Sequence, residues 1–298
     1  MDTKKDEYNY TQLNIVGNKI VDIATGEQFD ISNSTLLKKT SRGEFSVNYS
    51  SFNYINNDKL RDLIAAGIKD VDLALILCMS LNLIEGQNIC LAENDAPHST
   101  ASIANMIGQQ QQPVKMKLNR LIDLDLLYYG HVKQIGYNRK VFVVNPNFLK
   151  KGKIFNIFLK ELFTGSTSIL GKPSKISYKY NSYFHIDTSA LKNLIASGIR
   201  QVDLALFIFM SCNLEQDYNI CLDEKNKPHT SSSLSRLTNS SQQSIKSKLD
   251  MLVEKDLLHY GVLKEKKSYK KVYIANFHLV KGKRNFKSVI KLLFNDFN

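Results

Sequence analysis

One stretch of the chain occurs twice. Residues 97–130 return as residues 228–261, and between positions 60 and 130 the residue 131 places later is identical at 34 of 71 positions, without a gap. A shared amphipathic pattern alone does not require so many identities, so the repeat reflects a gene duplication. Any fold for this chain must therefore accommodate two copies of one structural unit.

Each copy has the pattern of two helices joined by a turn. Small hydroxyl residues that can cap a helix open the copy, a polar Gln/Ser cluster interrupts it, and a basic amphipathic segment follows. An apolar segment upstream, with almost no polar face, predicts the central buried helix of the unit. The predicted order is the winged helix-turn-helix order: helices 59–66 and 71–82, a strand at 88–91, helices 98–107 and 111–124, and strands 126–134 and 140–144 around a turn.

We therefore predict an α+β, mainly helical protein with two tandem winged helix-turn-helix domains. Residues 1–48 form a tail and a β-hairpin that turns at Thr25-Gly26, because alternating apolar residues flank that pair. The basic connector 35–50 is expected to be an edge strand and loop that caps the first domain. The predicted domains are 49–163 and 179–298, joined by a linker at 164–178 that is rich in Ser, Gly and Lys.

Two further amphipathic segments, 153–163 and 286–294, occupy corresponding places after the two units. Each is predicted to be a helix that packs on its own domain. The alternative is that these apolar faces form the seam of a homodimer.

The charge balance favours a polyanionic partner. The 298 residues include 40 Lys and Arg against 28 Asp and Glu, which gives a net charge of +12 and an isoelectric point near 9.3. Hydrophobic residues make up 43% of the chain, enough for packed cores.

The four cysteines lie in apolar runs without the CxxC spacing of a metal site, which predicts buried thiols in a reducing compartment. The N-terminus lacks the apolar core of a signal peptide, and no apolar run is long enough to span a bilayer. We expect a soluble cytoplasmic protein that is associated with the bacterial nucleoid or with a plasmid and has no membrane partner.

The second helix of each pair is the candidate recognition helix. Bases in the major groove are read by amide groups on adenine and by Arg or Lys on guanine, and these groups lie near the N-terminus of the helix that enters the groove. The sequence predicts DNA contacts by the polar residues of these helices: Gln111, Gln112, Lys115, Lys117, Asn119 and Arg120 in the first copy, and Gln242, Gln243, Lys246 and Lys248 in the second. The apolar positions Val114, Leu118, Leu121 and Ile122, with their counterparts, are predicted to face the core.

Basic residues also concentrate on the predicted wings. From His259 to the C-terminus there are ten basic and two acidic residues. Such side chains suit contacts with phosphates. The candidates are Lys133, Arg139 and Lys140 in the first copy and Lys264, Lys266, Lys267, Lys270 and Lys271 in the second.

Enzyme, metal and cofactor signatures do not stand out. His98 and His229 follow proline without other ligands at metal spacing, so each is predicted to cap or pack at a helix start. Asp72 and Asp203 are interpreted as helix N-terminal charges that interact with the dipole. Residues 165–172 have the wrong glycine spacing for a phosphate loop, and Pro173 replaces the required Ser or Thr. We expect no catalysis, no metal and no cofactor.

Several short motifs resemble the RepL-type plasmid replication proteins of Firmicutes. They are Ile20-Val21-Asp22, Thr25-Gly26-Glu27, Lys38-Lys39, Gly43-Glu44-Phe45, and the wing exit at 143–148 that ends in Lys151-Gly152-Lys153. The resemblance covers residues 13 to about 160 and implies a winged helix that binds a replication origin without catalysis. This chain departs from the family in its second unit and in replacing Asn-Pro by Asn276-Phe277. The tandem arrangement is also similar to iteron-binding plasmid initiators.

The resulting hypothesis is a double-stranded DNA-binding protein that reads two half-sites and initiates plasmid or phage replication, with helicase or primase as protein partners. The first alternative is a transcriptional regulator that acts with RNA polymerase. The second is a scaffold whose winged helices bind protein.

Overall fold

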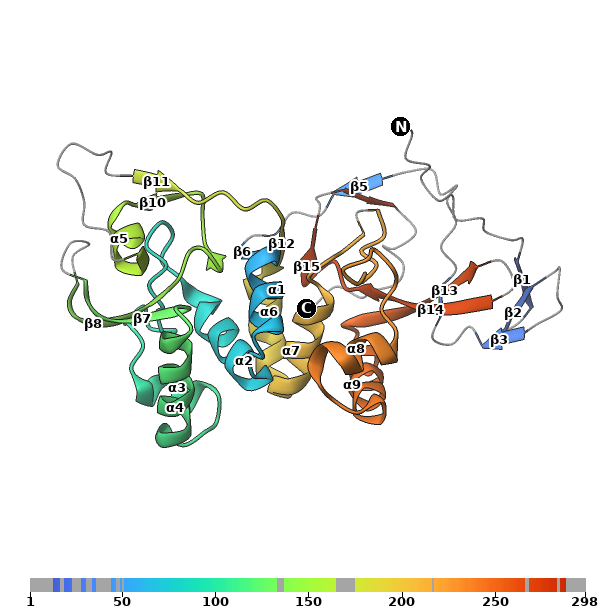
Figure 1. Cartoon of the computed structure of the whole chain (residues 1–298), viewed down its shortest axis with the longest axis horizontal. Helices are drawn as coiled ribbons and strands as arrows, with labels where there is room; N and C mark the ends of the chain where they lie inside the picture. Colours follow the sequence, from blue (N-terminus) through green and yellow to red (C-terminus); the bar gives the residue numbers. More distant parts are fainter. Residues whose placement is uncertain are drawn as a thin grey trace.

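The computed structural model of the chain is shown in Figure 1. Side chains are described at 49, 51–132, 139–164, 175–215, 217–261 and 272–282. The backbone alone is described at 13–16, 19–22, 28–30, 34–35, 44–46, 137–138, 262–265, 268–271 and 285–287.

The chain has an α+β fold with small, mostly antiparallel sheets, as the sequence predicts. Apart from the short 3-10 helix η2 of the first repeat, the described parts of the two repeats contain the same elements in the same order. The first consists of β6 (Phe52–Asn56), α1 (Asn57–Ala65), α2 (Asp70–Met79), η2 (Ser80–Asn82), α3 (Thr100–Met106), α4 (Gln111–Asp123), β7 (Leu127–Val132), β8 (Tyr137–Val144), β9 (Leu149–Lys150) and β10 (Ile154–Asn156). The second consists of β12 (Tyr183–Asp187), α6 (Thr188–Ala196), α7 (Gln201–Met210), α8 (Ser231–Thr238), α9 (Gln242–Glu254), β13 (Leu258–Glu265), β14 (Ser268–Ala275), β15 (Val280–Lys281) and β16 (Asn285–Lys287).

Helix boundaries follow from local side-chain chemistry. The Asn56 side chain accepts hydrogen bonds from two backbone N–H groups in the first turn of α1, and Asp187 does the same for α6. Ser99 and Ser102 form a reciprocal capping box at the start of α3. Gly67 has φ +77°, a left-handed conformation that lets the chain leave α1. Each repeat therefore encodes its own helix starts and stops.

The two repeats join in one antiparallel sheet of order β15-β12-β6-β9. In the central pair Tyr54 lies opposite His185, which is its own equivalent 131 residues later. Equivalent residues that pair in antiparallel strands are related by a twofold axis perpendicular to the sheet. The repeats are thus related by a pseudo-twofold axis that passes between Tyr54 and His185.

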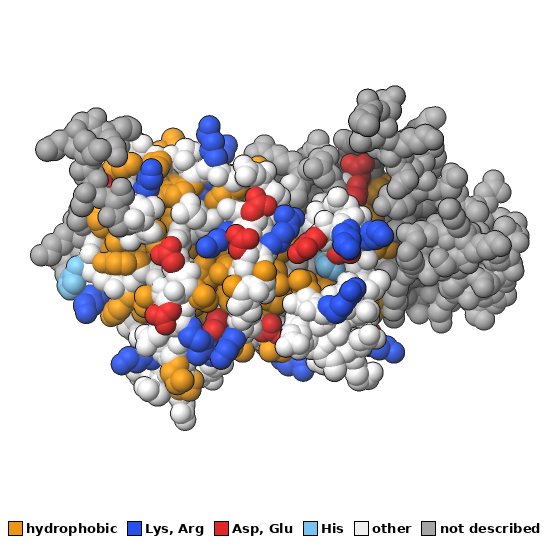
Figure 2. Space-filling view, viewed as in Figure 1, with side chains coloured by type: hydrophobic (Ala, Val, Ile, Leu, Met, Phe, Trp, Pro, Cys, Tyr) orange, Lys and Arg blue, Asp and Glu red, His pale blue; other side chains and the backbone are white. Residues whose placement is uncertain are grey.

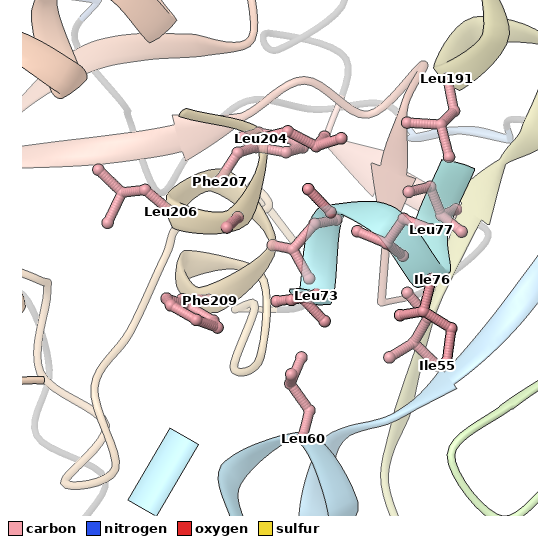
Figure 3. Close-up of a cluster of buried hydrophobic side chains, with 14 of the residues drawn as sticks. Ile55, Leu60, Leu73, Ile76, Leu77, Leu191, Leu204, Leu206, Phe207 and Phe209 are labelled. Atoms are coloured by element: carbon pink, nitrogen blue, oxygen red, sulfur yellow. The ribbon is translucent and has the colours of Figure 1, made fainter. Parts of the chain in front are cut away.

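Below this sheet, α2 and α7 pack against each other in the middle of the molecule (Figure 1). Both helices are buried almost throughout, which confirms the predicted central helix. One hydrophobic cluster takes residues from both repeats, including Leu73 and Ile76 of α2 and Phe207 of α7 (Figure 3). The core is therefore continuous across the pseudo-twofold axis.

Two short strands are exchanged between the repeats. β5 (Glu44–Ser46), which precedes the first repeat, pairs with β16 at the end of the second repeat. β11 (Lys175–Ser177), in the equivalent place before the second repeat, pairs with β10 at the end of the first. The registers agree after a shift of 131 residues: Ile154 lies opposite Ser177, and Asn285 lies opposite Ser46.

A tyrosine next to each exchanged strand adds a second contact. The Tyr49 hydroxyl donates to the carbonyl of Phe277 at 2.6 Å, and the Tyr180 hydroxyl donates to the carbonyl of Pro146. Burial raises the pKa of both phenols well above the usual value. The ammonium groups of two buried lysines lie over these rings, Lys281 over Tyr49 at 3.7 Å and Lys150 over Tyr180 at 4.1 Å.

The connector 35–50 lies against a different repeat from the one that the sequence predicts. It does not cap the first domain, because β5 completes the edge of β16 in the second repeat. β4 (Ser34–Thr35) likewise pairs with β13 of the second repeat. The predicted linker 164–178 also contains a strand, β11. The predicted division into two domains stays a prediction.

Other expectations are met in part. The N-terminal hairpin is confirmed by the pairing of β2 (Lys19–Asp22) with β3 (Gln28–Asp30), and β1 (Leu13–Val16) adds a third strand on β2. The predicted turn at Thr25-Gly26 lies outside the described residues.

The predicted strand 88–91 is instead a series of isolated bridges, since Ile89, Cys90 and Leu91 pair with three different segments of the chain. The predicted helix 153–163 begins only at Phe158, because β10 takes the preceding residues. This helix, α5 (Phe158–Thr164), packs on its own repeat through Leu159, as predicted. Most of the predicted helix 286–294 lies outside the described residues, and its first two positions belong to β16.

Within the described part of the chain, no helix combines the length and the apolar character that crossing a membrane requires.

Candidate nucleic-acid interface

The two candidate recognition helices lie on the same side of the molecule. In Figure 1 α3 and α4 occupy the lower left and α8 and α9 the lower right, on either side of α2 and α7. α4 packs on α2, and α9 packs on α7. Figure 2 shows Lys and Arg side chains along this lower edge. The pseudo-twofold axis thus runs from the shared sheet, between α2 and α7, toward the face that carries α4 and α9.

The apolar face of each helix packs into the core, as predicted. Val114, Leu118 and Leu121 of α4 are buried, and so are their equivalents in α9, Ile245, Leu249 and Leu252. Ile122 is an exception, because 37% of its surface is exposed at the edge of the apolar face.

The remaining surface of α4 carries a polar stripe. Gln112, Lys115 and Asn119 are exposed, at the i, i+3 and i+7 spacing that places side chains on one face of a helix. Gln111 is exposed beside them. In α9 the predicted residues Gln242, Gln243 and Lys246 are exposed in the same way. Seven of the predicted contact residues are therefore exposed, four on α4 and three on α9.

Met116 also belongs to this stripe, although it is not among the contacts that the sequence predicts. Its side chain is 57% exposed, between Lys115 and Asn119 on the outer face of α4. The i+4 spacing from Gln112 is the sequence signal that places it on this face. A methyl-bearing side chain at such a position can contact the methyl group of thymine.

Lys117 is not part of the exposed stripe. Its side chain is buried, and Nζ donates to Oε1 of Gln109 at 2.7 Å and to Oε1 of Gln201 at 3.2 Å. Burial lowers the pKa of this ammonium group. The helix thus turns position 117 toward Gln201 of α7 in the other repeat, which is not the exposed position that the sequence predicts.

Lys248, the equivalent of Lys117, is also turned inward. Its Nζ lies 3.1 Å from Oδ2 of Asp70 at the start of α2, and 12% of the side chain is exposed. Since Asp70 is the equivalent of Gln201, the two lysines make corresponding contacts across the pseudo-twofold axis. Lys248 therefore forms an ion pair between the repeats and does not belong to the exposed stripe; its DNA contact stays a prediction.

Arg120 is held by a buried carboxylate. Its Nε and Nη2 atoms donate to the two oxygens of Asp72, both at 2.7 Å, and Asp72 is almost fully buried. This contact raises the pKa of Arg120. Arg120 is therefore not part of the exposed stripe, because the buried carboxylate of Asp72 requires its charge as a partner; its predicted base contact stays a prediction.

In the second repeat the buried aspartate is also paired with an arginine, but this arginine comes from a different position in the sequence. Asp203, the equivalent of Asp72, is buried and accepts from Nε of Arg200 at 2.5 Å and from Nη2 at 2.9 Å. Position 200 corresponds to Lys69 in the first repeat, while Met251 stands where Arg120 would be. Each buried aspartate therefore pairs with an arginine, in addition to lying in the first turn of a helix. The arginine occupies a different position in each repeat, 120 in the first and 200 in the second.

The predicted wings correspond to two antiparallel hairpins, β7 with β8 and β13 with β14. Arg139 and Lys140 are exposed on β8, and Nζ of Lys140 lies 5.7 Å from the centroid of the Tyr129 ring. Two of the predicted wing cations are therefore exposed. The side chains of the other predicted wing lysines lie outside those described: Lys133, Lys264, Lys266, Lys267, Lys270 and Lys271.

No group of His, Cys, Asp and Glu that could hold a metal occurs among the described residues.

The four cysteines are free and buried, as expected, and burial raises the pKa of each thiol. His98 and His229 are buried at the starts of α3 and α8, as predicted, with Nδ1 of His98 3.0 Å from the Ser102 hydroxyl.

His229 makes stability depend on pH. Burial lowers the pKa of this imidazole from 6.5 to about 4, so the folded protein disfavours its protonation. The stabilisation is present above pH 6.5 and is lost as the pH falls from 6.5 to 4. The difference of 2.5 pKa units corresponds to roughly 3 kcal/mol. Urea unfolding across this range should show the loss, and His229→Gln should reduce the slope; an unchanged slope would contradict it.

No protein-family model matches the chain, and neither a curated protein nor a solved structure does. The resemblance to RepL-type proteins stays an expectation. Function must therefore be argued from the geometry.

Proposed function

We propose that this chain is a sequence-specific double-stranded DNA-binding protein made of two winged helix-turn-helix domains. The observation that carries the proposal is the exposed polar stripe of α4, which recurs at the equivalent positions of α9. In each repeat α3 or α8 precedes the candidate recognition helix, and a β-hairpin follows it. This order suits a helix in the major groove and a wing on the phosphate backbone.

The charges on this face support the same proposal. Lys115 and Lys246 are exposed at equivalent places in the two helices, while exposed Arg139 and Lys140 extend the positive charge to the first wing. Contacts of these cations with phosphates would release counterions, which makes affinity fall with salt. The amides Gln112 and Gln243 are suited to hydrogen bonds with adenine.

Within this class we propose initiation of plasmid or phage replication, which rests on the resemblance to RepL-type proteins. The binding site would then lie in an origin, where the protein would recruit helicase or primase. A site that overlaps a promoter would favour the alternative of a transcriptional regulator.

The mutational test separates affinity from specificity. With duplexes selected from a random pool, Lys115→Ala should weaken binding to all sequences and lower the salt slope by about 1, because one phosphate contact is lost. Gln112→Ala should instead reduce discrimination at one base pair by about 1–3 kcal/mol. Fluorescence anisotropy over a range of salt concentrations measures both effects.

Lys160→Ala is the matched control, since Lys160 is exposed on α5, away from the recognition helices. It should leave both quantities nearly unchanged. An equal effect of the Lys115 and Lys160 changes, or no binding to any duplex, would contradict the proposal and favour a protein-binding scaffold.

A further inference from the structure

We infer that one chain recognises an inverted repeat whose two half-sites are unequal. This inference rests on the proposed function and goes beyond it, because it specifies the symmetry of the DNA site and the number of chains that bind it.

The first step is the relation between the repeats. Four sets of contacts obey the pseudo-twofold axis: the pairing of β6 with β12, the exchanged strands, the Tyr49 and Tyr180 hydrogen bonds, and the contacts of Lys117 and Lys248. The four sets involve different residues. In each set, a contact made by one repeat is matched by the equivalent contact made by the other repeat. The arrangement is that of an isologous dimer within one chain.

The second step is the direction of the axis. It is perpendicular to the shared sheet, passes between α2 and α7, and emerges between the recognition helices (Figure 1). B-form DNA has its own twofold axes perpendicular to the duplex, so a protein with this symmetry reads two half-sites in opposite orientations. Reading a direct repeat would require two units related by translation along the duplex. An antiparallel pairing of equivalent strands does not provide that relation.

The distance between the two recognition helices is fixed by the packing of the core. The buried cluster includes α2 and α7, and Lys248 ties α9 to Asp70 of the other repeat. The two helices are therefore held in one packed unit and cannot separate to follow a longer spacer. We expect half-site centres about one helical turn apart, roughly 10 base pairs, and little tolerance of other spacings.

The fourth step concerns the difference between the half-sites. Gln112 and Lys115 are matched by Gln243 and Lys246, so both helices present the same groups there. Asn119 is replaced by Asp250, whose Oδ1 accepts a hydrogen bond from the Tyr260 hydroxyl at 2.8 Å. An asparagine amide suits adenine, whereas a carboxylate accepts from the amino group of cytosine. The repeat should be symmetric at the base pairs that the glutamines read and asymmetric at those read by positions 119 and 250.

A selection from random duplexes tests the symmetry directly. The selected sequences should contain two inverted half-sites, and native mass spectrometry should show one chain per duplex. Reversing one half-site, or inserting 5 base pairs between them, should weaken binding at least about tenfold, because the contacts of one helix are lost.

Asp250→Asn tests the inequality of the half-sites. In the variant α9 presents the same amide as α4, so the selected site should become more symmetric by a change in one half-site only. The reciprocal Asn119→Asp variant should change the other half-site, and Lys160→Ala should change neither.

The outcomes distinguish the inference from the function on which it rests. Specific binding to direct repeats, to a single half-site, or by two chains per site would overturn the inference and leave DNA binding intact. A uniform change of affinity in both variants would overturn the unequal half-sites. A selection without any preferred sequence would overturn the proposed function itself.

Discussion

Phe207→Ala should lower the free energy of unfolding by about 3–5 kcal/mol, the usual cost of removing a fully buried phenylalanine. Phe207 lies in α7 and is fully buried in the cluster that also contains Leu73 and Ile76 of α2 (Figure 3). Because the cavity opens in a core shared by both repeats, both should be destabilised together. Urea unfolding followed by circular dichroism gives the free energy, and hydrogen exchange in α2 and α7 gives its distribution.

Two variants serve as controls for this cavity. Ile76 occupies the position equivalent to Phe207, so Phe207→Ile keeps a side chain that the other repeat accepts and should cost less than Phe207→Ala. Met116→Ala removes an exposed side chain and should change stability by less than about 0.5 kcal/mol. If α2 keeps its exchange protection while α7 loses it, the repeats fold independently and the shared core does not couple them.

Arg120→Met should lower the free energy of unfolding by roughly 2–4 kcal/mol, because it leaves the buried carboxylate of Asp72 without its charged partner. We place the value toward the lower end, since 32% of the Arg120 side chain is exposed. The change installs the residue that the second repeat has at the equivalent position, Met251. Thermal and urea unfolding measure the loss.

The second repeat supplies the matched rescue. Lys69→Arg places an arginine at the position equivalent to Arg200, which holds the buried Asp203. The double variant Lys69→Arg with Arg120→Met should therefore recover most of the stability, and its preferred DNA sequence should match that of the original chain. A double variant as unstable as the single one would show that the carboxylate does not account for the loss.

Several features of the site could be predicted from the sequence. Because the chain is duplicated, two sequences are available for the same structural unit. Positions that are apolar in both copies, such as Leu118 and Leu249, identify the core face of the candidate recognition helix. The opposite face was predicted less well. Lys117 and Lys248 occur in both copies and both contact the other repeat, and a comparison of the two copies cannot distinguish such contacts from contact with DNA.

The sequence by itself determined the repeated order of elements, because helix caps, glycines and apolar periodicity act over a few residues. Only the tertiary structure decided how the copies meet. Strand exchange, the shared sheet and the pairing of Arg120 with Asp72 join residues far apart in the chain, and their free energies depend on burial that no local pattern records. The same long-range contacts place α4 and α9 on one face, where the pseudo-twofold axis orients them in opposite directions.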